Sequence, residues 1–372
     1  MHSLWRIGLG FFLAMGSLSS APAAENPQDR VNRLLATPTI QAAPGFTANV
    51  LIPPGQLYDP LIMLPVGDAI WLNDDGGEEE DKGSRLMAIS SAGKLTVLAD
   101  IGKLLPTVGF DIAPLGFGKF GGQIFTLAQA KVAMEGAVAN HVIQRVDPTH
   151  AYATSIVCTL PDAGKKKIPG FGLDARFGPP GSPFAGKFYA ITIYNDAIYQ
   201  VTPEGQCTPF VVFDGQHYSA PAMIVFAPDG QSMLVSVSRG AFDITSAAAP
   251  TGAIVRVSPA GKIDDKPVFE GPGRPMGMDF APPGFGAFGG QLFFADIGLF
   301  QIPVPMSQAI KADGKLYRLT RAGKAELVAS GLHNPIGVRF VGNKLWVTDI
   351  NGDFIAGKRE LPDGFVVEIQ AH

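Results

Sequence analysis

The chain has 372 residues, of which 46% are hydrophobic and 17% charged, and its formal net charge is −4. This composition allows a large apolar core. The sequence contains no basic block beyond Lys165 to Lys167, so nucleic acid is not an expected partner. The two cysteines, Cys158 and Cys207, are too few for a disulfide framework.

The N-terminal residues predict a secretory signal. Arg6 supplies a positive charge, an apolar run extends from Ile7 to Met15, and small residues follow from Gly16 to Ala24. We place cleavage after Ala23, so residues 1–23 are the predicted signal peptide, and we expect the mature protein to be periplasmic or secreted. The apolar run is about half the length of a membrane-spanning helix, so we expect no membrane association after cleavage; an uncleaved anchor is the alternative.

A strand-turn-strand phrase recurs along the rest of the chain. Its six copies begin at Leu61, Gly109, Gly172, Met223, Gly277 and Gly337. A second phrase follows each copy and consists of an apolar strand, a tight polar turn and another strand. The first apolar residues of these second phrases recur at steps of about 50 to 62 residues. They are Leu86, Ile143, Ile198, Ile254, Leu316 and Val366. Each period therefore holds four antiparallel strands, which is one propeller blade.

The last copy has no fourth strand, because only Gln370, Ala371 and His372 follow its third strand. An unassigned strand from Gly45 to Ile52 lies at the other end of the propeller sequence. We therefore predict an all-β fold, a six-bladed β-propeller of four antiparallel strands per blade, in which the N-terminal strand closes the last blade and removes an open edge. Residues 24–44 are a leader that packs outside, residues 45–372 are the single domain, and we expect a monomer.

Long loops gather on one rim of the predicted propeller, which marks the expected binding face. Aspartate and asparagine oxygens at the ends of second strands and in the blade-to-blade connections suit a hard cation such as Ca²⁺. The candidate ligands are Asp59, Asn195, Asp296, Asp349 and Asn351. The alternative is that strand-end aspartates cap turns and accept hydrogen bonds from backbone amides.

One segment has the spacing of a calcium loop. Asp349, Asn351, Asp353 and Glu360 occupy positions 1, 3, 5 and 12, where oxygen ligands wrap one ion. Position 6 is Phe354 rather than glycine, and the flanking segments are predicted strands instead of helices, which argues against this interpretation.

Two histidines, His217 and His333, lie directly before predicted inner strands, which makes them candidates for acid-base catalysis. The alternative is that both are hydrogen-bonded rim residues. The remaining catalytic candidates are Arg239 and Arg274, and the candidate cofactor contacts are Tyr218 and Asn334.

Two glycine-rich motifs have phosphate-loop spacing, at Gly116-x-Gly118-x-x-Gly121 and Gly284-x-Gly286-x-x-Gly289. Each leads into a strand rather than into the helix N-terminus that would hold a pyrophosphate, so we predict structural hairpins.

The strand assignment places Cys158 late in one outer strand and Cys207 early in the outer strand of the next blade. We therefore expect their Cα atoms to lie beyond bridging range, although export would permit one disulfide.

Two segments, Gly331 to Gly352 and Gly273 to Phe280, resemble the glucose/sorbosone dehydrogenase propellers. The resemblance implies an exported six-bladed oxidoreductase that acts on a sugar or alcohol with pyrroloquinoline quinone and binds calcium. His333 stands where that family has the arginine of its glycine-x-Arg-Asn-Pro phrase. Under this hypothesis His217 takes the substrate hydroxyl proton while Arg239 or Arg274 holds the quinone.

The turn from Phe226 to Gly230 and the strand from Lys344 to Asp349 are similar to those of senescence-marker/gluconolactonase and NHL-type propellers. This resemblance implies a metal-dependent lactonase or esterase, in which Asp59, Asn195 and Asp296 hold a cation that polarises a carbonyl. Met276 stands where those enzymes have a ligand aspartate. The third hypothesis is a non-catalytic propeller that binds a small molecule or a protein.

Overall fold

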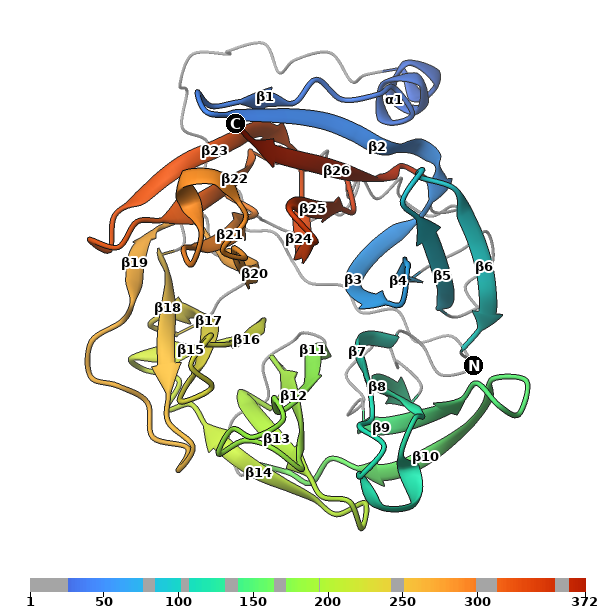
Figure 1. Cartoon of the computed structure of the whole chain (residues 1–372), viewed down its shortest axis with the longest axis vertical. Coiled ribbons are helices and arrows are strands. Elements are labelled where there is room, and N and C mark those ends of the chain that lie inside the picture. The colour runs from blue at the N-terminus through green and yellow to red at the C-terminus, as the bar shows by residue number, and fades with distance from the viewer. Residues whose placement is uncertain are drawn as a thin grey trace, which may run out of the picture.

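The computed structural model describes residues 26–75, 84–101, 107–130, 140–163, 172–193, 195–241, 251–298, 313–351 and 361–372. These residues form strands arranged radially around a central axis (Figure 1). Helical structure in them consists of α1 (Pro27–Leu34) and two single turns of 3₁₀ helix, η1 (Gly118–Phe120) and η2 (Gly286–Phe288). The predicted signal peptide lies outside the described residues.

Six antiparallel sheets form the blades. In each sheet the strands lie side by side, and their order goes from the axis to the perimeter (Figure 1). Blade 1 consists of β3 (Asp59–Val66), β4 (Ala69–Asp75), β5 (Arg85–Ser90) and β6 (Leu95–Asp100). Blade 2 consists of β7 (Thr107–Ile112), β8 (Ile124–Ala130), β9 (Asn140–Asp147) and β10 (Ala153–Thr159). Blade 3 consists of β11 (Gly172–Phe177), β12 (Phe188–Thr192), β13 (Ala197–Val201) and β14 (Cys207–Val212). Blade 4 consists of β15 (Tyr218–Ser219), β16 (Ile224–Phe226), β17 (Met233–Arg239), β18 (Thr251–Val257) and β19 (Phe269–Pro272). Blade 5 consists of β20 (Pro275–Phe280), β21 (Leu292–Asp296), β22 (Gly314–Leu319) and β23 (Ala325–Leu332). Blade 6 consists of β24 (Pro335–Val341), β25 (Lys344–Asp349), β26 (Gly364–Ala371) and β2 (Phe46–Leu57). The predicted six-bladed propeller is confirmed, and blade 4 divides its inner strand into two short segments that both pair with β17.

Burial differs between the middle and the outer strands of a blade. All five residues of β12 are buried, because neighbouring blades cover both faces of a middle strand. By contrast, most residues of the outer strand β10 are exposed. Middle strands therefore form nearly continuous apolar runs, whereas outer strands carry polar residues.

The N-terminal strand closes the ring as predicted. β2 pairs antiparallel with β26, from Phe46 opposite Ala371 to Leu57 opposite Gly364. The ring of Phe46 also stacks on Phe288 of blade 5 at 4.6 Å between centroids. The first strand thus completes blade 6 and contacts the blade beside it.

The leader lies on the outside of this closure, next to β2 (Figure 1). Asn26 caps α1 by accepting a hydrogen bond from the backbone N–H of Gln28 at 2.9 Å. The two-residue strand β1 (Gln41–Ala42) then pairs with β23, so the leader adds a fifth strand to blade 5. No helix in the described part of the chain is long and apolar enough to cross a membrane.

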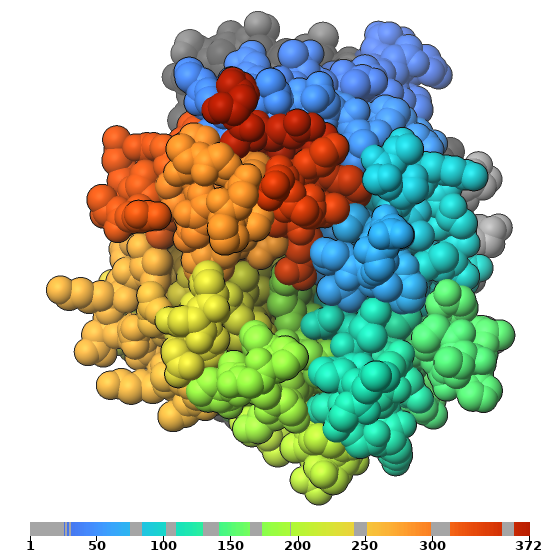
Figure 2. Space-filling model, in the orientation of Figure 1, coloured from blue at the N-terminus to red at the C-terminus, as the bar shows by residue number. Residues whose placement is uncertain are grey.

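Inner strands of adjacent blades approach each other very closely, and glycines make this approach possible. A Cβ atom on Gly277 of blade 5 would lie 2.2 Å from the carbonyl oxygen of Ile336 in blade 6, and one on Gly109 of blade 2 would lie 2.1 Å from the backbone nitrogen of Ala175 in blade 3. These glycines therefore allow the inner strands of adjacent blades to pack closely. Figure 2 shows the blades packed around the axis.

The glycine-rich motifs are hairpins, as predicted. Each makes one turn of 3₁₀ helix, η1 or η2, and leads into a second strand, β8 or β21. Phe120 of η1 is buried and packs edge-on against Phe125 of β8 at 5.4 Å. Phe117, directly before η1, packs edge-on against Phe177 of blade 3 at 4.8 Å, so this loop anchors an aromatic side chain between blades.

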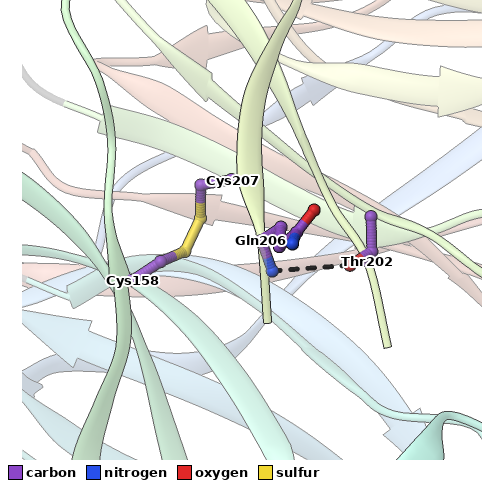
Figure 3. The surroundings of a disulfide bond; sticks show 4 residues. All are labelled: Cys158, Thr202, Gln206 and Cys207. Carbon is purple, nitrogen blue, oxygen red and sulfur yellow. Dashed lines mark hydrogen bonds between the residues drawn. A yellow bond between two sulfur atoms is a disulfide. The ribbon is translucent and has the colours of Figure 1, made fainter. Parts of the chain in front are cut away.

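Cys158 and Cys207 form a disulfide, and their Cα atoms are 6.2 Å apart (Figure 3). The expectation that they lie beyond bridging range is therefore wrong. Twist turns the outer strand of each blade toward the circumference, so the end of β10 points at the start of β14 (Figure 1). The bond joins the outer strands of blades 2 and 3.

Candidate functional site

Three strand-end aspartates on the long-loop rim accept hydrogen bonds from backbone amides of their own blade. Asp74 accepts from Tyr58 at 2.9 Å, and Asp296 accepts from Arg274 at 2.9 Å. Asp349 accepts from His333 at 2.8 Å. Each bond holds the incoming connection against the end of the second strand, which is the capping alternative that the sequence left open.

The carboxylates of Asp296 and Asp349 have additional backbone donors. Asp296 also accepts from Gly298 at 2.7 Å, and Asp349 from the amides of Asn334 and Asn351 at 2.9 Å each. Burial raises the pKa of both carboxyls, while these backbone hydrogen bonds oppose the increase. The described contacts of both residues are thus those of structural caps.

The predicted metal ligands are distributed over several blades. Asp59 belongs to blade 1, Asn195 to blade 3, where it bonds the Tyr199 side chain, and Asp296 to blade 5. Asp353 and Glu360 lie outside the described residues. Within the described ranges, no group of three or more His, Cys, Asp or Glu side chains is placed to hold a metal ion. The calcium loop therefore stays a prediction.

Four of the predicted residues, His333, Asn334, Asp349 and Asn351, do come together in blade 6. The Nδ1 atom of His333 contacts the Oδ1 atom of Asn351. Asn351 in turn donates to the carbonyl oxygen of Leu34 at 3.1 Å, at the end of α1. This cluster therefore attaches the leader to the last blade.

Arg274 is buried beside Asp296 rather than displayed on the rim. Burial lowers the pKa of its guanidinium, and the neighbouring Asp296 carboxylate partly compensates. Met276, two residues later, is also buried. It belongs to one apolar cluster with Leu61 and Ile336, from the inner strands of blades 1 and 6, and with Ala222, between β15 and β16 of blade 4.

Three other predicted residues, His217, Tyr218 and Arg239, line one cleft between blades 3 and 4. The cleft has a volume of about 460 Å³ and lies off the axis, where the end of β14 meets the outer part of blade 4. Its lining residues are Val212, Phe213, Asp214, His217, Tyr218, Arg239, Ile263, Asp264 and Asp265. Apolar and charged side chains thus meet in a cavity large enough for a small organic molecule.

Asp214 and His217, whose side chains are both exposed, form a hydrogen-bonded pair in the lining of this cleft. The Nδ1 atom of His217 lies 2.5 Å from the Oδ2 atom of Asp214. Because an ionised carboxylate only accepts, Nδ1 carries the hydrogen and Nε2 is left as the basic atom of the neutral ring. Aspartate orients the general-base histidine in this way in Ser-His-Asp triads.

The Asp214 carboxylate is well stabilised in its ionised form. Its Oδ1 atom accepts from the backbone amides of Gln216 at 2.9 Å and His217 at 2.8 Å. Although burial raises the pKa of this carboxyl, hydrogen bonds from the His217 side chain and from the amides of Gln216, His217 and Tyr218 lower it well below its usual range.

Arg239, at the end of β17, supplies the cation of the cleft. Its guanidinium lies 5.1 Å from the centroid of the Tyr218 ring and donates to the backbone carbonyl of His217 at 3.4 Å. Its Nε atom is 3.5 Å from a carboxylate oxygen of Glu270 on β19. These contacts hold the cation next to the histidine loop.

Asp196 of blade 3 closes the loop that carries the pair. Its backbone carbonyl accepts from the amide of Phe213 at 2.9 Å, and its Oδ1 atom accepts from the amide of Ala220 at 2.8 Å. Both ends of the segment 213–220 are therefore fastened to one residue, which fixes the position of His217.

Sequence reasoning missed Asp214, although the spacing Asp-x-x-His is visible at Asp214 to His217. The same spacing occurs at Asp147 to His150, where the side chains lie 2.9 Å apart in the turn between β9 and β10. The spacing therefore indicates a turn, and the cleft with Arg239 distinguishes His217 from His150.

No family profile matches this sequence, and no curated protein matches it. Solved structures match over most of their length. A putative oxidoreductase (glucose dehydrogenase) from Thermus thermophilus has a TM-score of 0.53 at 16% identity, covering 87% of this chain and 100% of its own. A putative gluconolactonase has a TM-score of 0.51 at 14% identity, with 90% and 98% covered. A luciferin-regenerating enzyme has a TM-score of 0.51 at 12% identity, with 90% and 95% covered. At these identities the likeness supports the propeller fold alone, to which the sequence resemblances also pointed.

Proposed function

We propose that the protein hydrolyses a lactone or ester of a small, neutral, hydroxyl-rich molecule in the cleft between blades 3 and 4. The observation that carries this proposal is the Asp214–His217 pair beside Arg239 in one cavity. A base oriented by a carboxylate can activate water, and a fixed cation can stabilise the oxyanion that forms in acyl hydrolysis.

The reaction follows from these groups. The Nε2 atom of His217 takes a proton from water as the water oxygen attacks the carbonyl carbon, and the guanidinium of Arg239 stabilises the oxyanion. The C–O bond to the leaving alkoxide then breaks, and the imidazolium of His217 returns its proton to that oxygen. Asp214 stays ionised throughout because its pKa is low. An ester thus gives an alcohol and a carboxylic acid, and a lactone gives a single hydroxy acid.

The charges of the cleft favour a neutral substrate. Asp264 and Asp265 also line the cavity, and Glu270 contacts Arg239. Carboxylates accept hydrogen bonds from substrate hydroxyls but repel anions. A lactone of a sugar meets both conditions.

Oxidation of a sugar or alcohol is the second candidate, because the structure brings together the His217 and Arg239 that this hypothesis requires. Pyrroloquinoline quinone does not fit this cleft, because it carries several carboxylates. The lining contains three aspartates, Asp214, Asp264 and Asp265, and its permanent cation is Arg239. Hydrolysis needs only water as the second reactant, and we therefore place it first.

The proposal is tested by incubating the protein with a panel of sugar lactones and simple esters. The release of acid is measured with and without a chelator. His217→Gln is expected to lower the rate by about 100-fold or more. His150→Gln is the matched control, because it removes the equivalent histidine of the other Asp-x-x-His turn. Activity that survives both chelation and His217→Gln would refute the proposed base.

Three further outcomes separate the other hypotheses. Dye reduction with sugars and alcohols, dependent on His217 and on added quinone, would favour the oxidoreductase. Loss of lactone hydrolysis on chelation would favour a metal-dependent lactonase. Tight binding without turnover of any substrate would indicate a non-catalytic propeller.

A further inference from the structure

A second cleft, of about 410 Å³, lies between blades 2 and 3. It is lined by Lys119, Phe120, Arg145, Ser155, Ile156, Val157, Glu204 and Gly205. These residues come from η1, from the two outer strands of blade 2 and from the turn before β14. The cleft shares no lining residue with the His217 site.

Cationic and apolar groups are adjacent in this second cleft. The ring of Phe120 lies under two cations, with the Lys119 Nζ atom 5.0 Å and the Arg145 guanidinium 5.9 Å from its centroid. Ile156 beside them is 54% exposed, which is unusual for so large an apolar side chain. A ligand that carries both an anion and an apolar body would cover both kinds of surface.

Blade 5 contains the same arrangement as blade 2. The guanidinium of Arg318 lies 4.6 Å from the centroid of Phe288, in η2, and its Nη1 atom donates to Gln291 at 2.6 Å. In blade 2, Arg145 lies over Phe120, and its Nη1 atom donates to Gln123 at 2.8 Å. The two blades can therefore be compared residue by residue.

The two copies differ in the partner on the outer strand. In blade 5, Glu326 is opposite Arg318 in the β-ladder, and its carboxylate pairs with the Nη2 atom of the arginine. In blade 2, the residue opposite Arg145 is Ser155, which accepts from the Nε atom at 2.6 Å. The hydroxyl thus stands where blade 5 has a carboxylate.

A second difference increases the positive charge of the blade 2 copy. The η1 turn carries Lys119 where the η2 turn has Ala287. One carboxylate, Glu204 of blade 3, faces the cleft from the other side, and the hydroxyl of Thr202 lowers its pKa. Two cations against one carboxylate leave the lining with a net positive charge.

We propose that this cleft binds a small carboxylate attached to an apolar, preferably aromatic, body. The ligand carboxylate would take the position that Glu326 occupies in blade 5 and bind Arg145 and Lys119. The apolar body would cover Ile156 and Val157. This inference does not depend on the proposed hydrolysis, because the two clefts have separate linings.

The disulfide fixes the two walls of this cleft (Figure 3). Cys158 follows Val157 on one wall, and Cys207 follows the Glu204–Gly205 turn on the other, with one residue between. A Cβ atom on Gly205 would lie 3.2 Å from the Val157 side chain, so the walls already approach closely there. The cross-link therefore preorganises the cleft and lowers the cost of binding.

Calorimetric titration of the whole protein with phenylpropionate tests the proposal. We expect saturable binding, with phenylpropanol at least about 10-fold weaker because it lacks the charge, and with inorganic phosphate at least about 10-fold weaker because it lacks the apolar body. Equal affinity for the acid and the alcohol, equal affinity for the acid and phosphate, or no binding of the acid would overturn the proposal.

The decisive variant is Ser155→Glu, which supplies the internal carboxylate that blade 5 tolerates beside Arg318. We expect it to weaken phenylpropionate binding by at least about 10-fold, as Arg145→Gln should. Arg318→Gln is the matched control in blade 5 and should leave binding unchanged. Binding that is insensitive to Ser155→Glu in a folded protein would overturn the proposal, even if Arg145→Gln fails to fold.

Discussion

The carboxylate of Asp279 in blade 5 accepts a hydrogen bond from the backbone amide of Phe340 in blade 6 at 2.8 Å. Asp111 in blade 2 makes the same bond to the amide of Phe177 in blade 3, also at 2.8 Å. The residues before those amides are Arg339 and Arg176, which contact nearby aspartates. The inner strands thus repeat every three blades, and carboxylates join neighbouring blades close to the axis.

Asp279→Ala should therefore lower the free energy of unfolding by about 2 to 3 kcal/mol, because it leaves the amides of Phe280 and Phe340 without their acceptor. Urea unfolding measures this change. Asp229→Ala is the control, since Asp229 accepts the Gln231 amide in an exposed turn. Equal effects of the two substitutions would contradict the role assigned to Asp279.

Asp214→Asn should change how stability depends on pH. The pKa of Asp214 is lowered on folding, so the ionised carboxylate stabilises the folded protein above the ordinary value of 3.8. That stabilisation is lost as the pH falls through the lower folded value. The difference in free energy of unfolding between wild type and variant should thus shrink as the pH falls below 3.8. Denaturant titrations above and below this pH measure it, and a difference that does not vary with pH would refute the prediction.

Asp196→Ala should loosen the segment 213–220 without unfolding the propeller. The substitution removes the acceptor of the Ala220 amide but keeps the backbone carbonyl that binds Phe213. Hydrogen exchange of the amides in this segment should become at least about 10-fold faster, which corresponds to a lost hydrogen bond of about 1.4 kcal/mol. Exchange on β12 should stay unchanged. If the segment exchanges as in wild type, Asp196 does not position His217.

Replacing Cys158 and Cys207 by serine should lower the free energy of unfolding by about 4 kcal/mol, because the cross-link closes a loop with a sequence separation of 49 residues. Urea unfolding with and without reductant measures the effect. The reductant should destabilise the wild type and leave the double variant unchanged. A wild type that is insensitive to full reduction would contradict this prediction.

The fold could be read from the sequence because its determinants are local. Gly277 and its counterparts recur at fixed positions of the repeat, and the apolar markers from Leu86 to Val366 all fall on third strands. The missing fourth strand after Val366 also identified the N-terminal strand as the closing element. Each of these features depends on the period and on turn residues, which a single sequence displays.

The site could be read only in part, because its geometry depends on contacts between blades. His217, Tyr218 and Arg239 were candidates, but their cleft is also lined by the end of β14 in blade 3, which only the packing of the two blades reveals. The same twist brings Cys158 to Cys207, which the strand order alone did not indicate. Aspartates with similar sequence positions also have different partners, since Asp296 caps its own blade whereas Asp196 binds the next.

The closure of the ring predicts the effect of one aromatic substitution. Phe46 is 6% exposed and packs against Phe288 of blade 5 and Phe293 of the same blade, at 4.6 and 6.2 Å between ring centroids. Phe46→Ala should therefore lower the free energy of unfolding by about 3 to 5 kcal/mol. Removal of residues 26–43 is the matched control, because it deletes α1 and β1 but keeps Phe46 and the pairing of β2 with β26. Thermal and urea unfolding of both variants measure the difference. If removal of the leader lowers the free energy of unfolding as much as Phe46→Ala does, then the outer strand of blade 5, rather than the closure of blade 6 by β2, limits the stability of the propeller.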